Sequence, residues 1–240
     1  MHQINQNKLD IMKRFLLVAM CATLLCNTSI YAAKKNVNGT ARIPELSPQE
    51  VGKTFDFSPE AAKAFAEDPD NETFSDIYDI IGGGCSFYCG CAIGTIKASS
   101  HLKAQGKRNY KPANIHDLNY ETAWVEGVAG NGVGQWIEYT LPAENPTITD
   151  ICVVNGYVRT RKAWEENSRP AVLEMFVNGK PKAMLYLKDV YAEQWFDVGE
   201  IKPKNGRPLK IKFVIRDVYP GTKYDDTAIT EIYFNGTGVH

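Results

Sequence analysis

Hydrophobic and polar residues alternate along most of the chain after residue 91. The clearest run is LKIKFVIRDV at 209–218, where Leu209, Ile211 and Phe213 alternate with lysines. A period of two places every second side chain on the same face, as in a strand with one face in a core. The same period, less regular, is found in GQWIEYTL, TITDICVVNGYV, AVLEMFVNGK, AMLYLKDV, QWFDVGEI and TAITEIYFNG.

The dipeptide Asn178-Gly179 joins two of these runs and predicts a hairpin, because a type I′ turn requires positive φ at both central residues. About eight short strands with turn signals and almost no helix are typical of an all-β domain. We therefore expect a jelly-roll β-sandwich from Cys85 to the end of the chain, over 85–240.

The stretch 34–84 has little alternation and is acidic. Ser58, Pro59 and Glu60 followed by AAKAFAED predict one short helix, with Ser58 as its N-cap. We interpret 34–84 as a linker with this helix, a short and partly helical N-terminal extension of the sandwich.

Residues 1–33 resemble a secretory signal peptide. Lys13 and Arg14 precede an apolar stretch from Phe15 to Leu25, and the small residues Ala32 and Ala33 stand just before Lys34. Export to the periplasm, the cell surface or the medium is therefore expected. Lipid anchoring at Cys21 or Cys26 is the alternative, although Met20 and Leu25 lack the small side chain expected before a lipidated cysteine.

The charge balance argues against one class of partner. The net charge of −1 provides no overall basic footprint, so a nucleic-acid partner is not expected. No membrane span is expected in the processed chain, because no segment of the required length is continuously apolar.

Four cysteines follow the signal segment, and an even number in an exported chain suggests disulfides. They are Cys85, Cys89, Cys91 and Cys152. Cys85–Cys89 with Cys91–Cys152 is one of three possible pairings, and the sequence does not choose among them. A zinc site is the alternative, but the two spaced ligand pairs of such a site are missing.

Several motifs resemble one family. NIHDLNYETAW at 114–124 is similar to the signature near the start of discoidin-like (coagulation factor type C, galactose-binding-like) domains, and TAITEIYF to their closing strand. KASSHL, TAWVEGVAGNGVGQWIEY, NGYV, NSRP and DVYPGTKYDDTAITEIYF resemble the glycan-binding translocation domain of secreted bacterial NAD glycohydrolases. The resemblance spans roughly 85–238. Leu118 departs from it, because the superfamily often has glycine there.

The resemblance implies a structural Ca²⁺ held by Asp117, Thr122, Glu231 and main-chain carbonyls near Asn114 and Asn119. Physical chemistry agrees, since a carboxylate inside an apolar strand must be paired or bind a cation, and Ca²⁺ accepts oxygen ligands from an irregular loop. In the alternative interpretation Glu231 pairs with Lys223 or an arginine, and Asp117 caps a turn.

A sugar site is expected around Trp164 in the charged stretch RTRKAWEENSRP, where a ring could stack on a pyranose beside Arg161, Asn167 and Arg169. The alternative is a tryptophan folded back onto the sandwich, with Arg169 paired to a carboxylate such as Asp226. A second candidate patch comprises Tyr219, Lys223, Tyr224 and Asp225. Trp124 is expected in the core and Trp136 half-buried.

Catalysis is not expected. Asp225 and Asp226 are adjacent, as are Glu165 and Glu166, and neighbours on an extended chain point to opposite faces, whereas a glycosidase needs two carboxylates across a cleft. Ser99, Ser100 and His101 lack an evident orienting acid. The sequence thus predicts a non-catalytic carbohydrate-binding module with glycan or glycoconjugate as partner. A protein-interaction or surface-attachment module and, less favoured, a hydrolase are the alternatives.

Overall fold

The structure is a computed structural model, and it describes residues 42–67, 87 and 90–237. The described fold belongs to one compact unit, Ile43–His240. The expected signal peptide at 1–33 lies outside the described residues, as do Cys85 and Cys89.

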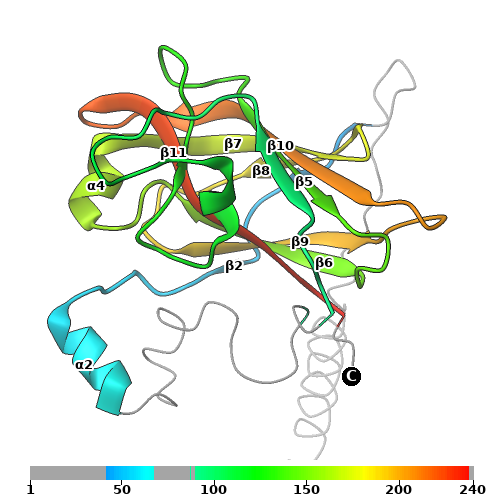
Figure 1. The fold of residues 1–240 in the computed structure, drawn as a ribbon, viewed down its shortest axis with the longest axis horizontal. Coiled ribbons are helices and arrows are strands. Elements are labelled where there is room, and N and C mark those ends of the chain that lie inside the picture. The colour runs from blue at the N-terminus through cyan, green and yellow to red at the C-terminus, as the bar shows by residue number, and fades with distance from the viewer. Residues whose placement is uncertain (1–41, 68–86, 88–89, 238–240) are drawn as a thin grey trace, which may run out of the picture. The chain divides into compact units, whose positions relative to one another are not determined.

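Strands dominate the described residues, as the alternating pattern predicts. In chain order the elements are β1 (Glu45–Leu46), β2 (Glu50–Val51), α2 (Pro59–Glu67), β3 (Thr95–Ala98), η2 (Pro112–His116), β4 (Trp124–Val125), β5 (Trp136–Leu141), β6 (Ile148–Asn155), α4 (Arg161–Glu166), β7 (Asn167–Val177), β8 (Lys180–Tyr186), β9 (Glu193–Ile201), β10 (Leu209–Tyr219) and β11 (Tyr224–Gly236). Figure 1 labels most of them.

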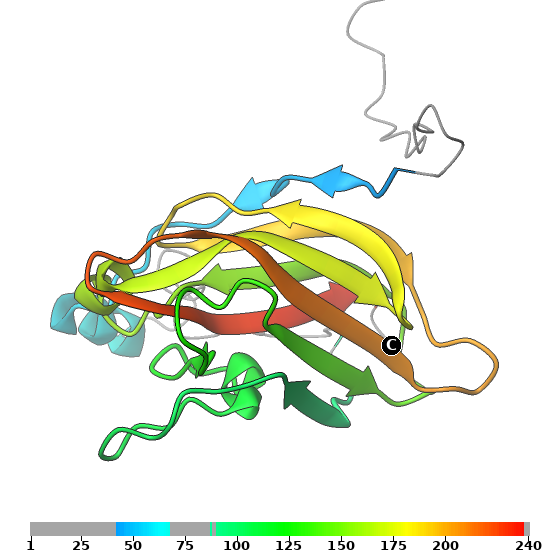
Figure 2. The ribbon, with the colours of Figure 1, turned by 90° about the horizontal axis from the view of Figure 1, so that it is seen from above.

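The strands form two layers that are joined through the long last strand. One layer has the order β2-β9-β6-β11, and the other has β7-β10-β5-β3 with β8 and β1 added beside β7. The start of β11 runs parallel to the start of β7, with Tyr224 opposite Asn167 and Thr227 opposite Ser168. Figures 1 and 2 show β11 passing from one layer toward the other. This arrangement confirms the predicted jelly-roll sandwich.

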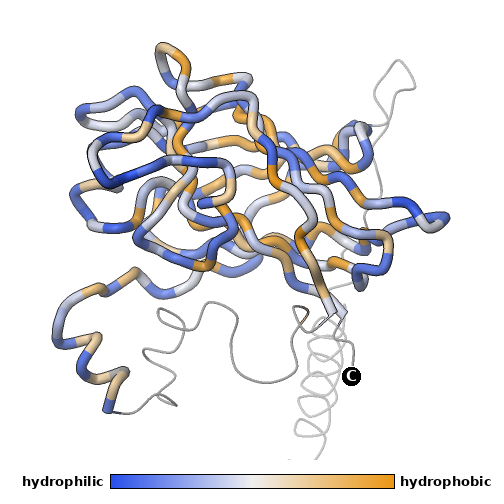
Figure 3. The backbone as a smooth tube through the Cα atoms, in the orientation of Figure 1, coloured by the Kyte–Doolittle hydropathy of each residue, from blue (hydrophilic) through white to orange (hydrophobic). Residues whose placement is uncertain are grey.

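The core lies between the two layers and follows the sequence period. Leu209, Ile211 and Phe213 of β10 are at most 1% exposed, whereas Lys210 between them is exposed. Figure 3 shows hydrophobic segments along the strands and hydrophilic ones in the connecting loops. Trp124 is fully buried and Trp136 half-buried, as predicted.

The predicted hairpin is present between β7 and β8. Asn178 and Gly179 have φ angles of 50° and 78°, which a type I′ turn requires. The Asn178 side-chain oxygen also accepts a hydrogen bond from Lys210 N at 3.0 Å, and this bond ties the turn to β10.

The sandwich begins earlier than residue 85. β1 pairs in parallel with β8, and β2 pairs antiparallel with β9, so the stretch before α2 adds a short strand to each layer. Phe55 packs with Tyr120 and Tyr191 at centroid distances of 4.9 and 5.4 Å. The prediction of a linker over 34–84 is therefore wrong for this part of the chain. A strand of two residues is too short to show an alternation of hydrophobic and polar residues in the sequence.

α2 begins at Pro59, and Ser58 accepts a hydrogen bond from Ala61 N at 3.1 Å through its hydroxyl. This is the capping geometry that the Ser-Pro-Glu pattern predicts.

Cys91 and Cys152 are both free thiols, so the suggested Cys91–Cys152 disulfide is not formed. Cys91 packs against the main core, whereas Cys152 on β6 lies in a separate cluster with Tyr233 and Trp164. The two sulfurs therefore belong to different hydrophobic clusters. Burial raises the pKa of the Cys91 thiol to about 12, so this thiol stays protonated at neutral pH.

Candidate functional site

The loop that follows η2 brings the predicted metal-binding residues together. Asp117 ends η2, and both of its carboxylate oxygens accept from the Thr122 hydroxyl at 2.8 Å. The Asn119 carbonyl accepts from Thr122 N at 3.1 Å. The loop therefore curls tightly, with oxygen atoms from a carboxylate, a hydroxyl and a carbonyl on neighbouring positions.

Glu231 of β11 reaches this loop from the core. Its side chain is 0% exposed, and its Oε1 accepts from Asn119 N at 3.0 Å. Its Oε2 is buried and has no hydrogen-bond partner among the described residues. A buried carboxylate oxygen without a partner is costly, so Glu231 must gain a proton or a cation.

The surroundings of Glu231 disfavour its negative charge. Its pKa is raised to about 9, mainly by burial and in part by the nearby Asp117, while the hydrogen bond from Asn119 N opposes the shift. Two neighbouring carboxylates disfavour one another's ionisation, so the pair retains a proton unless a cation neutralises it.

The alternative partners of Glu231 are engaged elsewhere. Lys223 Nζ lies 3.9 Å from Glu166 Oε1, and Glu231 forms no ion pair with any residue that the structure describes. The side-chain amide of Asn114 donates to the carbonyls of Asn109 and Ala123 at 3.0 and 3.1 Å, and the predicted ligand there is a main-chain carbonyl, which these bonds do not involve. Its amide therefore supports the loop and is not directed at a cation.

The described residues contain no group of three or more His, Cys, Asp and Glu side chains that could hold a metal ion. Asp117 and Glu231 would be the carboxylates of any site in this loop, and neutral oxygens from Thr122 and the main chain would have to complete it.

Leu118 adopts a φ of 57° at the position where the related superfamily often has glycine. The left-handed region costs a residue with a Cβ about 1–2 kcal/mol. We expect Leu118→Gly to preserve or raise the free energy of unfolding by up to about 1 kcal/mol in urea titrations. Leu102→Gly is the control, since Leu102 is also a half-buried loop leucine but lacks positive φ. An equal loss in both variants would contradict the strain argument.

Trp164 is not an exposed sugar platform. It lies in α4, is 4% exposed, and donates from Nε1 to the Asn155 carbonyl at 2.9 Å. The Arg169 guanidinium lies 4.0 Å from its ring centroid, and Tyr191 packs against its edge. The prediction of an open ring face in RTRKAWEENSRP is therefore wrong, and the alternative of a tryptophan folded onto the sandwich holds.

Arg169 is a structural residue in this arrangement. Its Nε and Nη2 donate to the two carboxylate oxygens of Asp189 at 2.5 and 2.9 Å. Its Nη1 donates to the carbonyls of Trp164 and Asn167 at 3.2 Å. The carboxylate that pairs with Arg169 is that of Asp189, not that of Asp226 as suggested, because Asp189 lies on the loop after β8 and this loop reaches the Arg169 guanidinium.

The other predicted ligand residues separate into three groups. Arg161 pairs with Glu165 at 2.8 Å, and Tyr219 donates from its hydroxyl to the Leu187 carbonyl at 2.9 Å, so both support local structure. Asp225 is exposed and lies outside the cavity between α4, β4 and the start of β11. Asn167 and Tyr224 line that cavity, and Lys223 lies beside it, 4.7 Å from the Tyr224 ring.

A cavity of about 160 Å³ opens between α4, β4 and the start of β11. It is lined by Leu102, Gln105, Arg108, Tyr110, Val125, Tyr157, Ala163, Glu166, Asn167, Tyr224 and Asp226. The lining combines three tyrosine rings with amide, guanidinium and carboxylate groups. Such a mixture of ring faces and convergent polar groups is typical of a small-ligand site.

Two charged groups of the cavity are available to a ligand. Neither Arg108 nor Asp226 forms an ion pair with a residue that the structure describes. Burial raises the pKa of Asp226, and the neighbouring Asp225 adds to this shift. Glu166 differs, because Lys162 and Lys223 lie 3.8 and 3.9 Å from it. Arg108 and Asp226 thus offer a donor and an acceptor for hydroxyl groups.

Sequence reasoning missed Arg108, Tyr110, Tyr157 and Asp226 as members of this cavity. These residues come from segments that are distant in the chain, and Tyr110 and Tyr157 meet only through folding, at a centroid distance of 6.4 Å. The one sequence signal for this cavity was the family motif NGYV, which contains Tyr157.

The serine–histidine stretch does not form a catalytic pair. Ser99 and Ser100 both donate to Gln135 Oε1, at 2.6 and 2.7 Å, and His101 is exposed. The hydroxyls therefore support the start of β5, and no described base accepts from them in place of Gln135.

Comparisons with known proteins agree with this fold. The family model described as the NAD glycohydrolase translocation F5/8 type C domain matches residues 87–235. Among curated proteins no sequence matches this chain. In the part of the chain that the structure describes, no helix has the length and apolar character needed to cross a bilayer.

Solved structures with similar folds are distant in sequence. The family 32 carbohydrate-binding module of Clostridium perfringens NanJ, solved with galactose, is 16% identical, and the match covers 59% of this chain and 93% of that one at a TM-score of 0.42. CpGH89CBM32-5 from the same organism, solved with GalNAc-β-1,3-galactose, is 13% identical, with 59% and 94% coverage and a TM-score of 0.43. The mycobacterial arabinofuranosyltransferase AftD is 20% identical with a TM-score of 0.40, and the match covers 59% of this chain and 11% of that one.

Proposed function

Since the chain belongs to the NAD glycohydrolase translocation F5/8 type C domain family, we propose that it is a non-catalytic glycan-binding module of an exported protein. The observation that supports this function most directly is the cavity between α4, β4 and β11. Its size suits a single sugar unit, and its walls offer the ring faces and polar groups that sugars require.

The chemistry of the cavity supports binding over catalysis. Tyr224 is 42% exposed and presents a ring on which the apolar face of a pyranose can stack. Arg108 can donate to sugar oxygens, and Asp226 can accept from hydroxyls. Asp226 and Glu166 are the carboxylates of the lining, but Glu166 is held by two lysines. Incubation with NAD and with chromogenic glycosides tests the hydrolase alternative, and turnover would contradict a purely binding role.

We further propose that Ca²⁺ organises the loop after η2. Asp117, Thr122, Glu231 and main-chain carbonyls such as that of Asn119 would hold the ion, while Asn114 supports the loop from behind. The buried Glu231 Oε2 without a partner and the adjacent Asp117 carboxylate favour a hard cation with oxygen ligands. Bound Ca²⁺ would supply positive charge that holds β11 to the loop, and it has no part in a reaction.

A glycan array tests the binding function. We expect Tyr224→Ala to lower affinity for the best array ligand about tenfold, because the stacking surface is lost. Asp226→Asn should weaken binding by a similar factor, because one hydroxyl acceptor is removed. Titration calorimetry with that ligand measures both effects.

Tyr186→Ala is the matched control for this experiment. Tyr186 on β8 is also 42% exposed but lies outside the cavity. Equal losses in Tyr224→Ala and Tyr186→Ala would show that the cavity is not the site. If the protein binds no glycan on the array, a protein-interaction module is favoured instead.

A further inference from the structure

Two stretches of the chain contain basic residues and no acidic ones, although the net charge is −1. Residues 90–116 include Lys97, Lys103, Lys107, Arg108 and Lys111. Residues 201–216 include Lys202, Lys204, Arg207, Lys210, Lys212 and Arg216. The acidic residues that balance these charges lie elsewhere in the sequence, so the net charge conceals a local excess of cations.

Strand pairing brings the two stretches side by side at one edge of the sandwich. β3 pairs with β5 and β5 with β10, so that Lys97, Glu138 and Lys212 form one row across the three strands. Lys210 lies 3.5 Å from the Glu138 carboxylate. Glu138 is the one acidic residue of β3 and β5. Three lysines therefore surround Glu138 on this face. Glu174 of β7 lies on the same face but is paired with Arg216 at 2.5 Å, so the face keeps an excess of positive charge.

The same face offers groups that suit sugars. Trp136 is half-buried beside these lysines, and Lys212 Nζ lies 5.8 Å from its ring centroid and 5.0 Å from that of Phe176. Thr95 and Thr140 lie opposite one another in the next row and point outward with the lysines. The cation–ring contacts restrain Lys212, and the ring and hydroxyls provide stacking and hydrogen bonding beside the charges.

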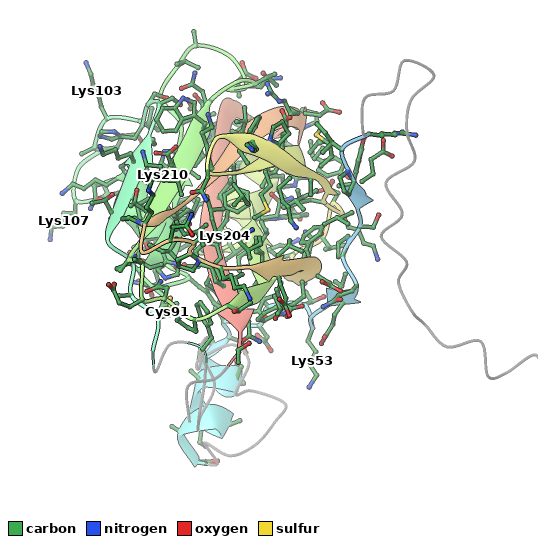
Figure 4. The ribbon with its side chains drawn as sticks, turned by 90° about the vertical axis from the view of Figure 1, so that its right-hand side faces the viewer. Lys53, Cys91, Lys103, Lys107, Lys204 and Lys210 are labelled. Carbon is green, nitrogen blue, oxygen red and sulfur yellow. The ribbon has the colours of Figure 1, made fainter. Side chains whose placement is uncertain are left out.

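The loops at both ends of these strands extend the positive charge. Lys103 and Lys107 are exposed on the loop after β3. Lys204 and Arg207 are exposed on the β9–β10 connection, where their backbones form an isolated bridge. Figure 4 shows Lys103 and Lys107 projecting outward beside β3, with Lys204 and Lys210 on the side that faces the viewer. We call Lys97, Lys103, Lys107, Lys204, Arg207, Lys210 and Lys212 the basic strip.

We propose that the basic strip binds a linear acidic polysaccharide, with carboxylates repeated along a sugar backbone. An elongated row of cations across strands and two loops matches a chain-like polyanion and is not the shape of a closed pocket. The ring of Trp136 and the threonine hydroxyls favour a sugar backbone over lipid chains, which need exposed apolar side chains for insertion. The strip and the cavity have no residue in common, although Lys103 and Lys107 lie on the loop whose Leu102, Gln105 and Arg108 line the cavity, and the proposal does not rest on the cavity being a sugar site.

The full chain can be tested with oligogalacturonate and with its methyl ester, which has the same backbone without the charge. We expect wild type to bind the acid and not the ester, with affinity that falls steeply as NaCl is raised. The triple variant Lys97→Gln, Lys210→Gln, Lys212→Gln should lose about tenfold or more in affinity for the acid. Biolayer interferometry at several salt concentrations measures these changes.

The control variant Lys53→Gln, Lys63→Gln, Lys188→Gln removes the same charge at exposed positions outside the strip and should bind as wild type. Equal losses in both triple variants would overturn the proposal, because net charge and not the strip would then govern binding. Equal or tighter binding to duplex DNA or to anionic lipid vesicles would overturn the assignment to a polysaccharide. Tyr224→Ala should leave oligogalacturonate binding intact, and this result separates the strip from the cavity.

Discussion

Replacing Glu231 with glutamine is expected to abolish the calcium-dependent rise in the melting temperature of this protein. If the proposed ion binds the folded state alone, saturation to one hundred times its dissociation constant adds about 2.7 kcal/mol to the free energy of unfolding. For a domain of this size that gain corresponds to roughly 5–10 °C. The physical reason is that Glu231 Oε2 is buried without a partner, and glutamine cannot provide its charge. Differential scanning calorimetry with chelator and with CaCl₂ measures the effect.

The pH dependence without calcium follows from the same residue. The pKa of Glu231 is about 9 in the folded chain against an ordinary value of 4.5, so between these values the folded chain holds a proton that the unfolded chain has lost. The free energy of unfolding of chelated protein should therefore fall as pH rises from about 4.5 to 9. Glu231→Gln resembles the protonated form, and it should be more stable than chelated wild type at pH 8.

Glu126→Gln is the matched control. Glu126 is also 0% exposed, but both of its carboxylate oxygens accept backbone N–H groups, from Thr227 at 3.2 Å and Val128 at 2.8 Å. Glutamine there should lower stability and leave the calcium response unchanged. If Glu231→Gln retained the full response, the ion would have to bind elsewhere or not at all.

Arg169→Ala should be strongly destabilising, by about 3 kcal/mol or more. The change removes the two-point pairing with Asp189, two bonds to the carbonyls of Trp164 and Asn167, and the stacking on Trp164. The Asp189 carboxylate is half-exposed, so water can solvate it once Arg169 is removed. The main loss of stability therefore comes from the hydrogen bonds to the carbonyls of Trp164 and Asn167 and from the packing on the Trp164 ring. Arg169→Lys should recover little, because an ammonium cannot make the planar pair of bonds. Urea unfolding followed by tryptophan fluorescence measures these changes.

Arg161→Ala provides the comparison for Arg169. Arg161 also lies near Trp164, at 4.8 Å, but it is exposed and pairs with Glu165 on the surface. Exposed pairs of this kind contribute about 0.3–0.5 kcal/mol, so the loss should be small. Similar losses in both variants would contradict the structural role of Arg169. If Arg169→Ala kept its stability but lost glycan binding, Arg169 would have to be a ligand-binding residue after all.

Local patterns predicted the elements of the fold well. The alternation in 209–218, the Asn178-Gly179 turn and the Ser58 cap each depend on residues that are neighbours in the chain, and each is present in the structure. The very short β1 and β2 escaped detection because their strand character comes from pairing with β8 and β9.

The candidate sites were predicted unevenly. The family resemblance placed Asp117, Asn119, Thr122 and Glu231 together, and the structure brings Glu231 of β11 against the loop that contains the other three. The cavity shares with the predicted sugar site only Asn167 and Tyr224. Trp164 was assigned to the surface because its flanking residues are charged, yet α4 turns its ring onto Arg169 and Tyr191.

By itself the sequence determined the strand periodicity, the tight turns and the family to which the chain belongs, because these depend on short stretches of residues. Tertiary structure alone decided which side chains from distant segments meet and which share a surface. The row of Lys97, Glu138 and Lys212 follows from strand pairing between distant segments, and the meeting of Tyr110 with Tyr157 and the separation of Cys91 from Cys152 depend on how loops pack in the folded chain. Net charge and composition average over such placements, and for this reason they indicated neither the cavity nor the basic strip.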